Sequence, residues 1–497
     1  DVSVYRKHKF IFIDTTGGRV LRPLFIGHEK PKKLPTTLNE AMMMGIIEYL
    51  SIHEENYTQD PHCEIHSSFL FSRVIGTIPD QEKNTSPKLT FTTAMEKQVF
   101  LGPYKDLNHR MDTERNVLWY AQHPLVYTEM GKNTISGCNP IVAYMPGATE
   151  DGLIFNQGSI DRGMFRATSF KTLREQVCIG EDIKSIVAPG EIVQKNQPFM
   201  VKSKLIYKFR KKGKRNVSET KDVKIKSKFS GKVHKTMIYE AADGSTGVKV
   251  QLRVDRIPTV GDKFASRFAQ KGVISRIVKQ EDMIYTKDGI SPDIIFNPHS
   301  IPSRMTLGHV AETECAKLSA LRGRRMDRTS ATDRVPTTQE IIQEMKDMGF
   351  NYKGTEAMYC GKTGKKLKVP IFIGSNYYRR LNHNSMDKIW GRARGRRNIS
   401  NRQPNTGRSN GGAFRVGEME KDCIQNWGSA MVLRDRLLIN SDAFKIDICK
   451  KCGCFHLVKN KCLSCKSKQT KTITVPYPFY MLLNELFSVN INVRMIN

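Results

Sequence analysis

The sequence is short of acidic residues relative to basic ones, and it has no long apolar run. Its 497 residues include 80 lysines and arginines against 49 aspartates and glutamates, a formal net charge of +31. No run approaches the roughly 18 apolar residues of a membrane-spanning helix. The stretch DVSVYRKHKF at the N-terminus is charged and lacks the apolar core of a signal peptide. We therefore expect a protein without a membrane partner.

Several catalytic signatures are also missing from the sequence. There is no GxxxxGK[ST] loop for a nucleoside triphosphate, and no convincing Ser/His/Asp or Cys/His arrangement for nucleophilic catalysis. We find no internal repeat. Any chemistry on phosphates must therefore use other groups.

The excess of positive charge is clustered. Residues 201–235 carry 14 lysines and arginines with two acids, and residues 361–415 carry 14 with Asp387 as the single acid. Clusters of this kind neutralise phosphates and release counterions, which favours nucleic acid as the partner. The alternative is a basic surface that is merely solvated.

Five of the 11 cysteines lie within residues 449–465, in the pattern CKKCGCF and KCLSC. Two CxxC pairs, Cys449/Cys452 and Cys462/Cys465, are spaced to present four thiolates to a structural Zn²⁺ ion. Cys454 could replace Cys452, and His456 could also compete. A disulfide framework is not expected in a long chain without a secretion signal, so the cysteines indicate an intracellular protein.

The stretch GDKFASRFAQKG at 261–272 places Lys263 and Lys271 next to glycines, which let a backbone approach a ligand closely. Lysine is a compact charge that suits phosphate oxygens, although both lysines could simply be surface residues. Arg304 precedes a predicted helix, and its planar fork can grip a phosphate or cap a neighbouring carbonyl.

Glu150 and Asp151 lie in a turn between two apolar strands predicted within 140–160. They could be an exposed turn, or they could supply half of a Mg²⁺ site. Mg²⁺ is usually held by one or two protein carboxylates together with substrate phosphates.

The remaining patterns give a coarse secondary structure. We expect helices at 41–51, 92–102, 305–322 and 337–348, a β-rich module at 170–260, and an irregular basic segment at 390–412. We also expect strands around a Thr-Gly-Gly hairpin turn within 4–26, a loop at 81–89, a mobile charged linker at 207–222, and a helix and strand at the C-terminus.

Several long stretches resemble the second-largest (β-like) subunit of multisubunit DNA-directed RNA polymerases of the eukaryotic, archaeal and large-DNA-virus type. The resemblance covers nearly the whole chain and corresponds to the C-terminal portion of such a subunit, as a fragment or as a split subunit. The stretches are GGRVLRPLF (17–25), HCEIHSSF (62–69), NTSPKLTFTTAMEKQ (84–98), TEDGLIFNQGSIDRGMFR (149–166), GDKFASRFAQKG (261–272), NPHSIPSRMTLGHVAE (297–312), YYRRLNHNSMDKIWGRARG (377–395) and NRQPNTGRSNGGAFRVGEMEKDC (401–423).

The resemblance implies a mixed α/β multidomain protein with a β-barrel hybrid-binding core, an inserted β-rich wall and a C-terminal anchor and clamp with a zinc ribbon. The implied parts are an external-type region (1–71), a hybrid-binding domain in two parts (72–166 and 257–415), a wall or flap (167–256), an anchor (416–437) and a clamp portion (438–497). The implied partners are the largest and the smaller polymerase subunits, the DNA template, the DNA–RNA hybrid and nucleoside triphosphates.

The resemblance also implies roles for individual residues. Lys263 and Lys271 would lie beside the RNA 3′ end and the incoming nucleotide, and Arg304 would contact its phosphates. Asp151, with Glu150, would help hold a second Mg²⁺, while the first belongs to the largest subunit. Further contacts to nucleotide or nucleic acid are expected from Lys88, Lys97, Gln98, Gln270, Arg392, Arg394, Arg402, Arg408 and Arg415.

The sequence departs from the family pattern at specific points. Phe268-Ala269 replaces His-Gly, Glu96 replaces Gly, Lys88 replaces Arg, and Gly152 replaces Ser. ARGR replaces the common ARGP at 393–396, and the stretch GRSNGGAF is one residue shorter than the usual form in the family. We therefore expect a divergent lineage, in the nucleus if cellular and in the host cytoplasm or virion if from a large DNA virus. The alternatives are a non-catalytic nucleic-acid-binding scaffold derived from such a subunit, and a free-standing zinc-ribbon factor that leaves the other motifs unexplained.

Overall fold

The protein is a mixed α/β chain that divides into two compact units, residues 1–387 and 388–497. The structure, a computed structural model, describes residues 2–17, 19–27, 38–57, 61–65, 72–103, 111–147, 149–178, 180–208, 217–241, 243–330, 335–458 and 461–495. The division falls within the predicted range 257–415, and the five boundaries between the predicted parts stay predictions. No helix among these residues is long and apolar enough to cross a membrane.

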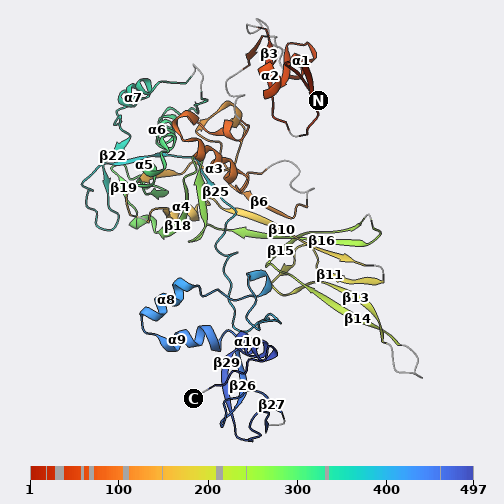
Figure 1. Ribbon diagram of the computed structural model, residues 1–497. Helices are drawn as coiled ribbons and strands as arrows, with labels where there is room; N and C mark the ends of the chain where they lie inside the picture. The colour runs from red at the N-terminus through yellow and green to blue at the C-terminus, as the bar shows by residue number, and fades with distance from the viewer. Residues whose placement is uncertain are drawn as a thin grey trace. The chain divides into compact units, whose positions relative to one another are not determined.

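The centre of the first unit is an eight-stranded sheet in the order β22-β24-β8-β20-β9-β18-β17-β25 (Figure 1). Most neighbours are antiparallel, but β18 pairs with β9 and β20 pairs with β8 in parallel. The strands are β8 (Ile141–Tyr144), β9 (Gly152–Asn156), β17 (Lys263–Ser266), β18 (Lys271–Val278), β20 (Ile294–Phe296), β22 (Thr355–Glu356), β24 (Ile371–Ser375) and β25 (Tyr378–Arg380).

Helix α6 (Leu307–Arg322) packs against β24 and ends at Gly323, whose φ of +68° is the left-handed conformation of a helix C-cap. Helix α7 (Thr338–Asp347) begins with the predicted capping box of Thr337 and Glu340. Both predicted helices are therefore confirmed. Their neighbours in the same unit are α4 (Gln157–Asp161), α5 (Ser300–Arg304), and the strand pairs β7 (Val126–Tyr127) with β21 (Met326–Asp327) and β19 (Tyr285–Thr286) with β23 (Met358–Tyr359).

The predicted β-rich module is confirmed, because the regular secondary structure described between residues 167 and 256 consists of β-strands. Two sheets share them, a five-stranded one (β12-β15-β16-β10-β6) and a three-stranded one (β11-β13-β14). The strands are β6 (Glu114–Leu118), β10 (Ala167–Val177), β11 (Glu181–Ile186), β12 (Ile192–Val193), β13 (Pro198–Lys208), β14 (Val217–Lys226), β15 (Gly231–Glu240) and β16 (Thr246–Arg256).

The prediction of a mobile linker at 207–222 was wrong at both ends. Lys208 pairs with Val217 as β13 and β14 form an antiparallel hairpin, so cross-strand pairing overrides the high charge of this stretch. The middle of the predicted linker, residues 209–216, lies outside the described residues.

The N-terminal region differs from its prediction in how the strands pair. The tight hairpin joins β1 (Ser3–Lys7) and β2 (Phe10–Asp14), whereas β3 (Leu21–Ile26) pairs with β4 (Ile47–Ser51) and β5 (His62–Glu64). The predicted helix at 41–51 is replaced by α1 (Leu38–Met43) and β4, because Gly45, at φ +67°, breaks the helix between them. Helix α2 (Ile52–Tyr57) follows β4.

Helix α3 spans Ser86–Glu96, so the predicted loop at 81–89 and helix at 92–102 were both misplaced. Pro87 lies in the first turn, where its missing N–H costs no hydrogen bond. After a turn at Lys97 and Gln98, Val99 and Leu101 form isolated bridges to Leu381 and Val117. Tertiary pairing therefore ends this helix earlier than its local pattern predicts.

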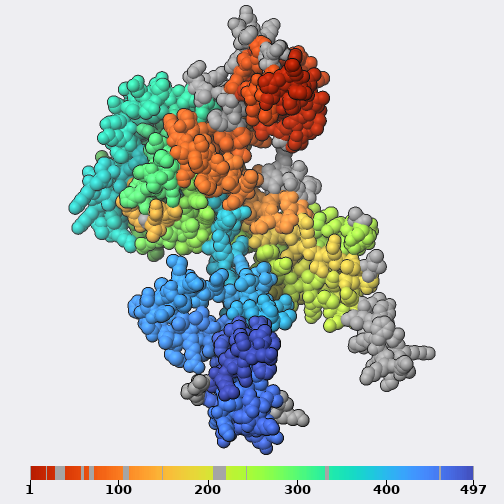
Figure 2. Space-filling view, viewed as in Figure 1, coloured from red at the N-terminus to blue at the C-terminus, as the bar shows by residue number. Residues whose placement is uncertain are grey.

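The second unit, drawn in blue in Figures 1 and 2, combines short helices with a β-ribbon. Its elements are α8 (Glu418–Asn426), α9 (Ala430–Arg434) with a π-helical turn (Asp435–Ile439), β26 (Ala443–Cys449), β27 (Leu457–Val458), β28 (Lys461–Cys462), β29 (Thr470–Pro476) and α10 (Tyr477–Ser488). The predicted C-terminal helix is confirmed. Residues 489–495 form no strand, although the backbone of Met495 bonds to Gly453.

Candidate phosphate-handling site

The site begins where two parallel strands start side by side. Lys271 opens β18 and Asp151 directly precedes β9, and the N–H of Val273 donates to the carbonyl of Asp151 at 3.0 Å. A Cβ on Gly272 would lie 2.9 Å from that carbonyl oxygen and 2.8 Å from Leu153 Cγ. Glycine is therefore required here for the two strands to approach, which brings Lys271 close to the acidic turn.

The strand register also relates the two lysines of the 261–272 stretch. Lys263 pairs with Val273, and Ala265 pairs with Lys271, in the antiparallel β17–β18 ladder. Residues directly opposite one another share a face, and so do residues two apart on one strand. Lys263 and Lys271 are therefore diagonal neighbours on one face of the sheet, Lys271 exposed and Lys263 half-buried.

Arg304 lies at the end of α5 and points at the acidic turn. Its Nη2 atom is 2.5 Å from Asp151 Oδ1, and its Nη1 atom donates to Gln270 Oε1 at 3.2 Å. The left-handed backbone of Met305, at φ +51°, ends α5 directly after it. Glu150 is exposed beside this pair. The structure thus brings together Asp151 and Arg304, two residues predicted from separate motifs.

Gln270 is placed differently from its expected role. Its side chain is 1% exposed, and its amide nitrogen donates to the Thr306 hydroxyl at 2.6 Å and to the Ser300 carbonyl at 3.1 Å. With the bond from Arg304, the amide oxygen is also used. Gln270 is therefore built into the protein beneath Arg304, where it fixes that side chain rather than presenting itself to nucleic acid.

Lys88, on α3, completes the positive side of the site. Burial lowers its pKa first of all, and the nearby charges of Arg304 and Lys271 lower it further, while Asp151 opposes them. Crowded cations of this kind would be relieved by a bound polyanion.

Phe91 is a member of the site that sequence reasoning missed. The ammonium groups of Lys88 and Lys271 lie 5.9 Å and 5.7 Å from the centre of its ring, which is 55% exposed. A cation near an aromatic face is attracted to it. The signal in the sequence was an aromatic residue three positions after a lysine, because two residues at this spacing lie on the same face of a helix.

Glu96, which replaces a family glycine, forms a partly buried ion pair with Arg379 of β25. Two residues further on, the amide oxygen of Gln98 accepts a hydrogen bond from His383 Nε2 at 2.8 Å, and the backbone carbonyl of Gln98 accepts from the N–H of Asn382. These contacts hold the end of α3 to residues 379–383. Lys97 is exposed between them.

Phe268 and Ala269, which stand where the family has His-Gly, are accommodated in the core. Ala269 adopts φ +57°, the left-handed conformation that favours glycine. Phe268 is 1% exposed and lies edge-on to His309, with ring centres 5.9 Å apart. His309 is fully buried, its Nδ1 atom is 3.2 Å from the Tyr144 hydroxyl, and burial lowers its pKa to about 3.

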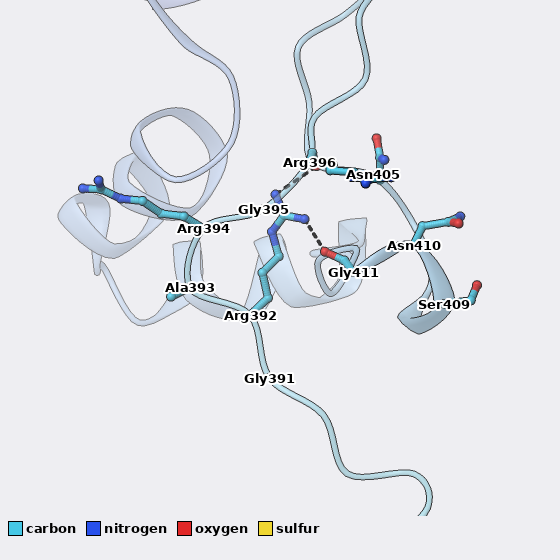
Figure 3. A pocket seen from close by; sticks show the side chains of 10 residues that line it. All are labelled: Gly391, Arg392, Ala393, Arg394, Gly395, Arg396, Asn405, Ser409, Asn410 and Gly411. Atoms are coloured by element: carbon cyan, nitrogen blue, oxygen red, sulfur yellow. Dashed lines mark hydrogen bonds between the residues drawn. The ribbon is translucent and has the colours of Figure 1, made fainter. Parts of the chain in front are cut away.

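The basic segment predicted at 390–412 is irregular, as expected, but it is folded on itself. The guanidinium of Arg392 donates to the carbonyls of Gly411 and Arg396, as Figure 3 shows. Arg402 packs its guanidinium 4.2 Å and 4.8 Å from the ring centres of Tyr477 and Phe444. Both arginines therefore help to shape the segment. Arg394, Arg408 and Arg415 are exposed.

The predicted zinc ligands meet in the ribbon. The Sγ atoms of Cys449, Cys452, Cys462 and Cys465 all lie within 4.8 Å of one another. The pairs Cys449–Cys465 and Cys452–Cys462 are 3.4 Å apart, near the edge of about 3.8 Å that a tetrahedron with Zn–S bonds of about 2.3 Å would have. The four residues fit a closed structural Zn²⁺ site.

The two competitors for zinc are placed elsewhere. Cys454 is buried outside this group and accepts a contact from the Ser464 hydroxyl at 3.6 Å. The ring of His456 lies against the rings of Phe455 and Phe487 and is tilted to both, with ring centres 3.9 Å and 3.6 Å away. Backbone N–H groups, first that of Cys465, lower the pKa of the Cys462 thiol to about 6, which favours the thiolate that binds metal.

Comparison with known proteins agrees with the resemblance seen in the motifs. A family model described as RNA polymerase Rpb2, domain 6, matches residues 74–410, and one described as RNA polymerase Rpb2, domain 7, matches residues 411–497.

Curated relatives extend this similarity over most of the chain. DNA-directed RNA polymerase II subunit RPB2 of Encephalitozoon cuniculi is 35% identical over 99% of this chain and 50% of its own length. DNA-directed RNA polymerase II subunit 2 of Arabidopsis thaliana is 36% identical over 95% of this chain and 43% of its own length. DNA-directed RNA polymerase subunit Rpo2 of Sulfolobus acidocaldarius is 35% identical over 98% of this chain and 49% of its own length. The chain therefore spans about half the length of these relatives or less.

Proposed function

The chain belongs to the Rpb2 family of second-largest RNA polymerase subunits, and we propose that it forms the nucleotide-handling half of such a subunit's active centre. The proposal rests on one cluster, in which Lys88, Lys271 and Arg304 surround Asp151 at the start of β9 and β18. Three cations beside one exposed acidic turn suit a nucleoside triphosphate and its metal ion.

In the proposed reaction the RNA 3′ hydroxyl attacks the α-phosphate of the bound nucleotide in line, and pyrophosphate leaves. Arg304 grips phosphate oxygens through its planar fork, and Lys271 places a point charge at the start of β18. Lys263, on the same sheet face, lies toward the RNA end. These charges lower the barrier by stabilising negative charge on the transferring group without reorganising during the reaction.

Asp151 and Glu150 fit part of a Mg²⁺ site, because Mg²⁺ takes few protein carboxylates and shares the phosphates of its substrate. When bound, the ion would neutralise negative charge on the phosphate oxygens of the nucleotide. Asp151 exchanges its ion pair with Arg304 for this role, which frees the guanidinium for phosphate. Carboxylates of the largest subunit would hold the other metal ion.

The remaining residues are proposed to hold nucleic acid and partners. Lys97 and Gln98 contact the hybrid beside a barrel that includes the eight-stranded sheet, and the exposed Arg394, Arg408 and Arg415 contact DNA phosphates. The zinc ribbon stabilises the clamp portion. Partners are the largest and smaller polymerase subunits, in the nucleus of a cell or, for a viral enzyme, in the host cytoplasm or virion. Finding the gene in a cellular genome would refute a viral origin.

The proposal is tested by RNA extension on a primed DNA scaffold with the complex purified through this chain. We expect extension by the complex and none by the isolated chain, since the chain supplies only part of a two-metal site. Extension by the chain alone would contradict the shared active centre. Binding of the scaffold by the complex without extension would favour the non-catalytic scaffold instead.

A further inference from the structure

Helix α3 ends at Glu96, and a carboxylate at this end of a helix needs a partner. The free carbonyl groups of the last turn carry partial negative charge, so an acidic side chain there is unfavourable by itself. The guanidinium of Arg379, on β25, lies against this carboxylate and offsets its charge. A glycine, which the family has at this position, has no side chain that could reach Arg379. The ion pair is therefore a feature of this sequence and not of the family pattern.

The pair is largely shielded from solvent. The side chain of Arg379 is 4% exposed and that of Glu96 is 16% exposed. The Nη1 atom of Arg379 donates to Glu96 Oε2, and the guanidinium also lies 5.9 Å from the centre of the Tyr377 ring. Separating the partners would leave a buried charge uncompensated, which is costly. The pair therefore fixes the end of α3 more firmly than a solvated surface pair would.

Arg379 lies in one row of the sheet with Lys271 of the phosphate-handling site. Arg379 pairs with Ala265 in the β25–β17 ladder, and Ala265 pairs with Lys271 in the β17–β18 ladder. Directly opposed residues of antiparallel strands lie on one face of a sheet. Arg379 and Lys271 therefore share a face and stand two strands apart, about 10 Å between their backbones.

Helix α3 contacts both ends of this row. Lys88, Thr92 and Glu96 follow one another at intervals of four residues, so they lie on one side of the helix. Thr92, in the middle, is 2% exposed, so this side of the helix is turned into the protein. The eight residues from Lys88 to Glu96 span about 12 Å, close to the length of the row. At the Lys88 end, the ammonium groups of Lys88 and Lys271 share the ring of Phe91, at 5.9 Å and 5.7 Å.

We propose that Glu96 is a positioning residue for nucleotide handling. Its ion pair with Arg379 sets where α3 lies over the sheet, and so holds Lys88 beside the other cations of the site. The inference rests on the proposed function and adds to it a residue that does not touch the nucleotide. A displacement of about 1 Å that begins far from the chemistry can lower activity by about a hundredfold, so the end of a short helix can matter at its start.

The test is RNA extension on a primed DNA scaffold by the complex purified through this chain, with kcat and the KM for nucleoside triphosphates measured separately. We expect Glu96→Ala to raise the KM by roughly tenfold, because Lys88 is no longer held in place beside the phosphates. A purely structural role would lower the fraction of active complex, and with it the apparent kcat, but would leave the KM unchanged.

The matched control is Glu356→Ala, at the opposite edge of the same sheet. Glu356, on β22, forms an ion pair with Lys317 of α6, and these side chains are 23% and 11% exposed. Each alanine variant removes the carboxylate partner of a partly buried cation, so both should lower the stability of the chain. Only Glu96→Ala should change the KM.

Two further variants show how Glu96 acts. Glu96→Met combined with Arg379→Met removes both charges and keeps side-chain volume, so no buried charge is left unpaired and the chain should fold. This double variant should raise the KM as Glu96→Ala does. Lys88→Ala should also raise the KM, and adding Glu96→Ala to it should have little further effect, because mutations that act through one contact are not additive.

The outcomes separate this inference from the proposed function. A normal KM in Glu96→Ala or in the double variant, together with a raised KM in Lys88→Ala, would overturn the positioning role and leave the phosphate contact of Lys88 in place. Fully additive effects of Glu96→Ala and Lys88→Ala would overturn it as well. No extension by the wild-type complex, or a normal KM in Lys88→Ala, would count against both.

Discussion

Arg304 and Asp151 form an ion pair, with Nη2 and Oδ1 2.5 Å apart, at the start of two parallel strands. The side chains are 23% and 50% exposed, so solvent screens the pair and its contribution to folding stability is small. Its importance lies in placement. In the proposed function Arg304 binds phosphate and Asp151 helps to hold a metal ion, so a metal-bound triphosphate would satisfy both side chains.

The fork of Arg304 should matter beyond its charge. We expect Arg304→Lys to raise the KM for nucleoside triphosphates by roughly tenfold, equivalent to about 1.4 kcal/mol, because a lysine cannot bind phosphate bidentately. Steady-state RNA extension by the purified complex measures this. Arg276→Lys, at an exposed position of β18, is the matched control, and an equal KM in both variants would contradict the phosphate contact.

Gln270 should act through Arg304. Replacing it with alanine leaves a buried donor and acceptors unpaired, which should cost about 1–3 kcal/mol in the free energy of unfolding. Gln251→Ala removes a side chain that is equally buried, within β16. We expect both variants to lose stability in urea unfolding but only Gln270→Ala to raise the nucleotide KM. A normal KM in Gln270→Ala would reduce its role to packing.

Zinc binding should depend on Cys452 and not on Cys454. We expect one zinc per chain, measured by metal analysis after dialysis, in the wild type and in Cys454→Ser. Cys452→Ser should lose the metal, and a chelator should unfold the ribbon in the wild type, since binding energy of a structural zinc is folding energy. Retention of zinc by Cys452→Ser would mean that Cys454 or His456 completes the site.

His309 should make the first unit less stable in acid. Its folded pKa, about 3, lies below the ordinary value of 6.5, so only the unfolded state takes up a proton as the pH falls below about 6.5. The free energy of unfolding should therefore drop by up to about 1.4 kcal/mol per pH unit through this residue.

Urea unfolding between about pH 7 and about pH 5 tests this dependence in the range where histidine titrates. His309→Phe, which cannot titrate, should show a flatter profile. An equally steep profile in that variant would assign the acid sensitivity to other groups.

The sequence predicted locally encoded features better than the pairing of distant segments. Local patterns revealed the capping box of α7 and the Gly323 cap, since both depend on neighbouring residues alone. Pairing between distant segments was not visible, so the sequence misplaced α3 and paired β3 with the wrong partner. The burial of Gln270 and the position of Phe91 beside two lysines depend on the packing of α3 and α5 near β18, which no local pattern encodes.

The central claim is that the lysines of the 261–272 stretch act on the reacting nucleotide or RNA end. The most direct test is RNA extension on a primed scaffold by complexes carrying wild-type chain, Lys271→Ala, or Lys287→Ala as an exposed control. At equal scaffold occupancy we expect Lys271→Ala to extend RNA at least about tenfold more slowly, because the variant lacks the positive charge that stabilises the transferring group. Equal rates in all three would contradict the claim.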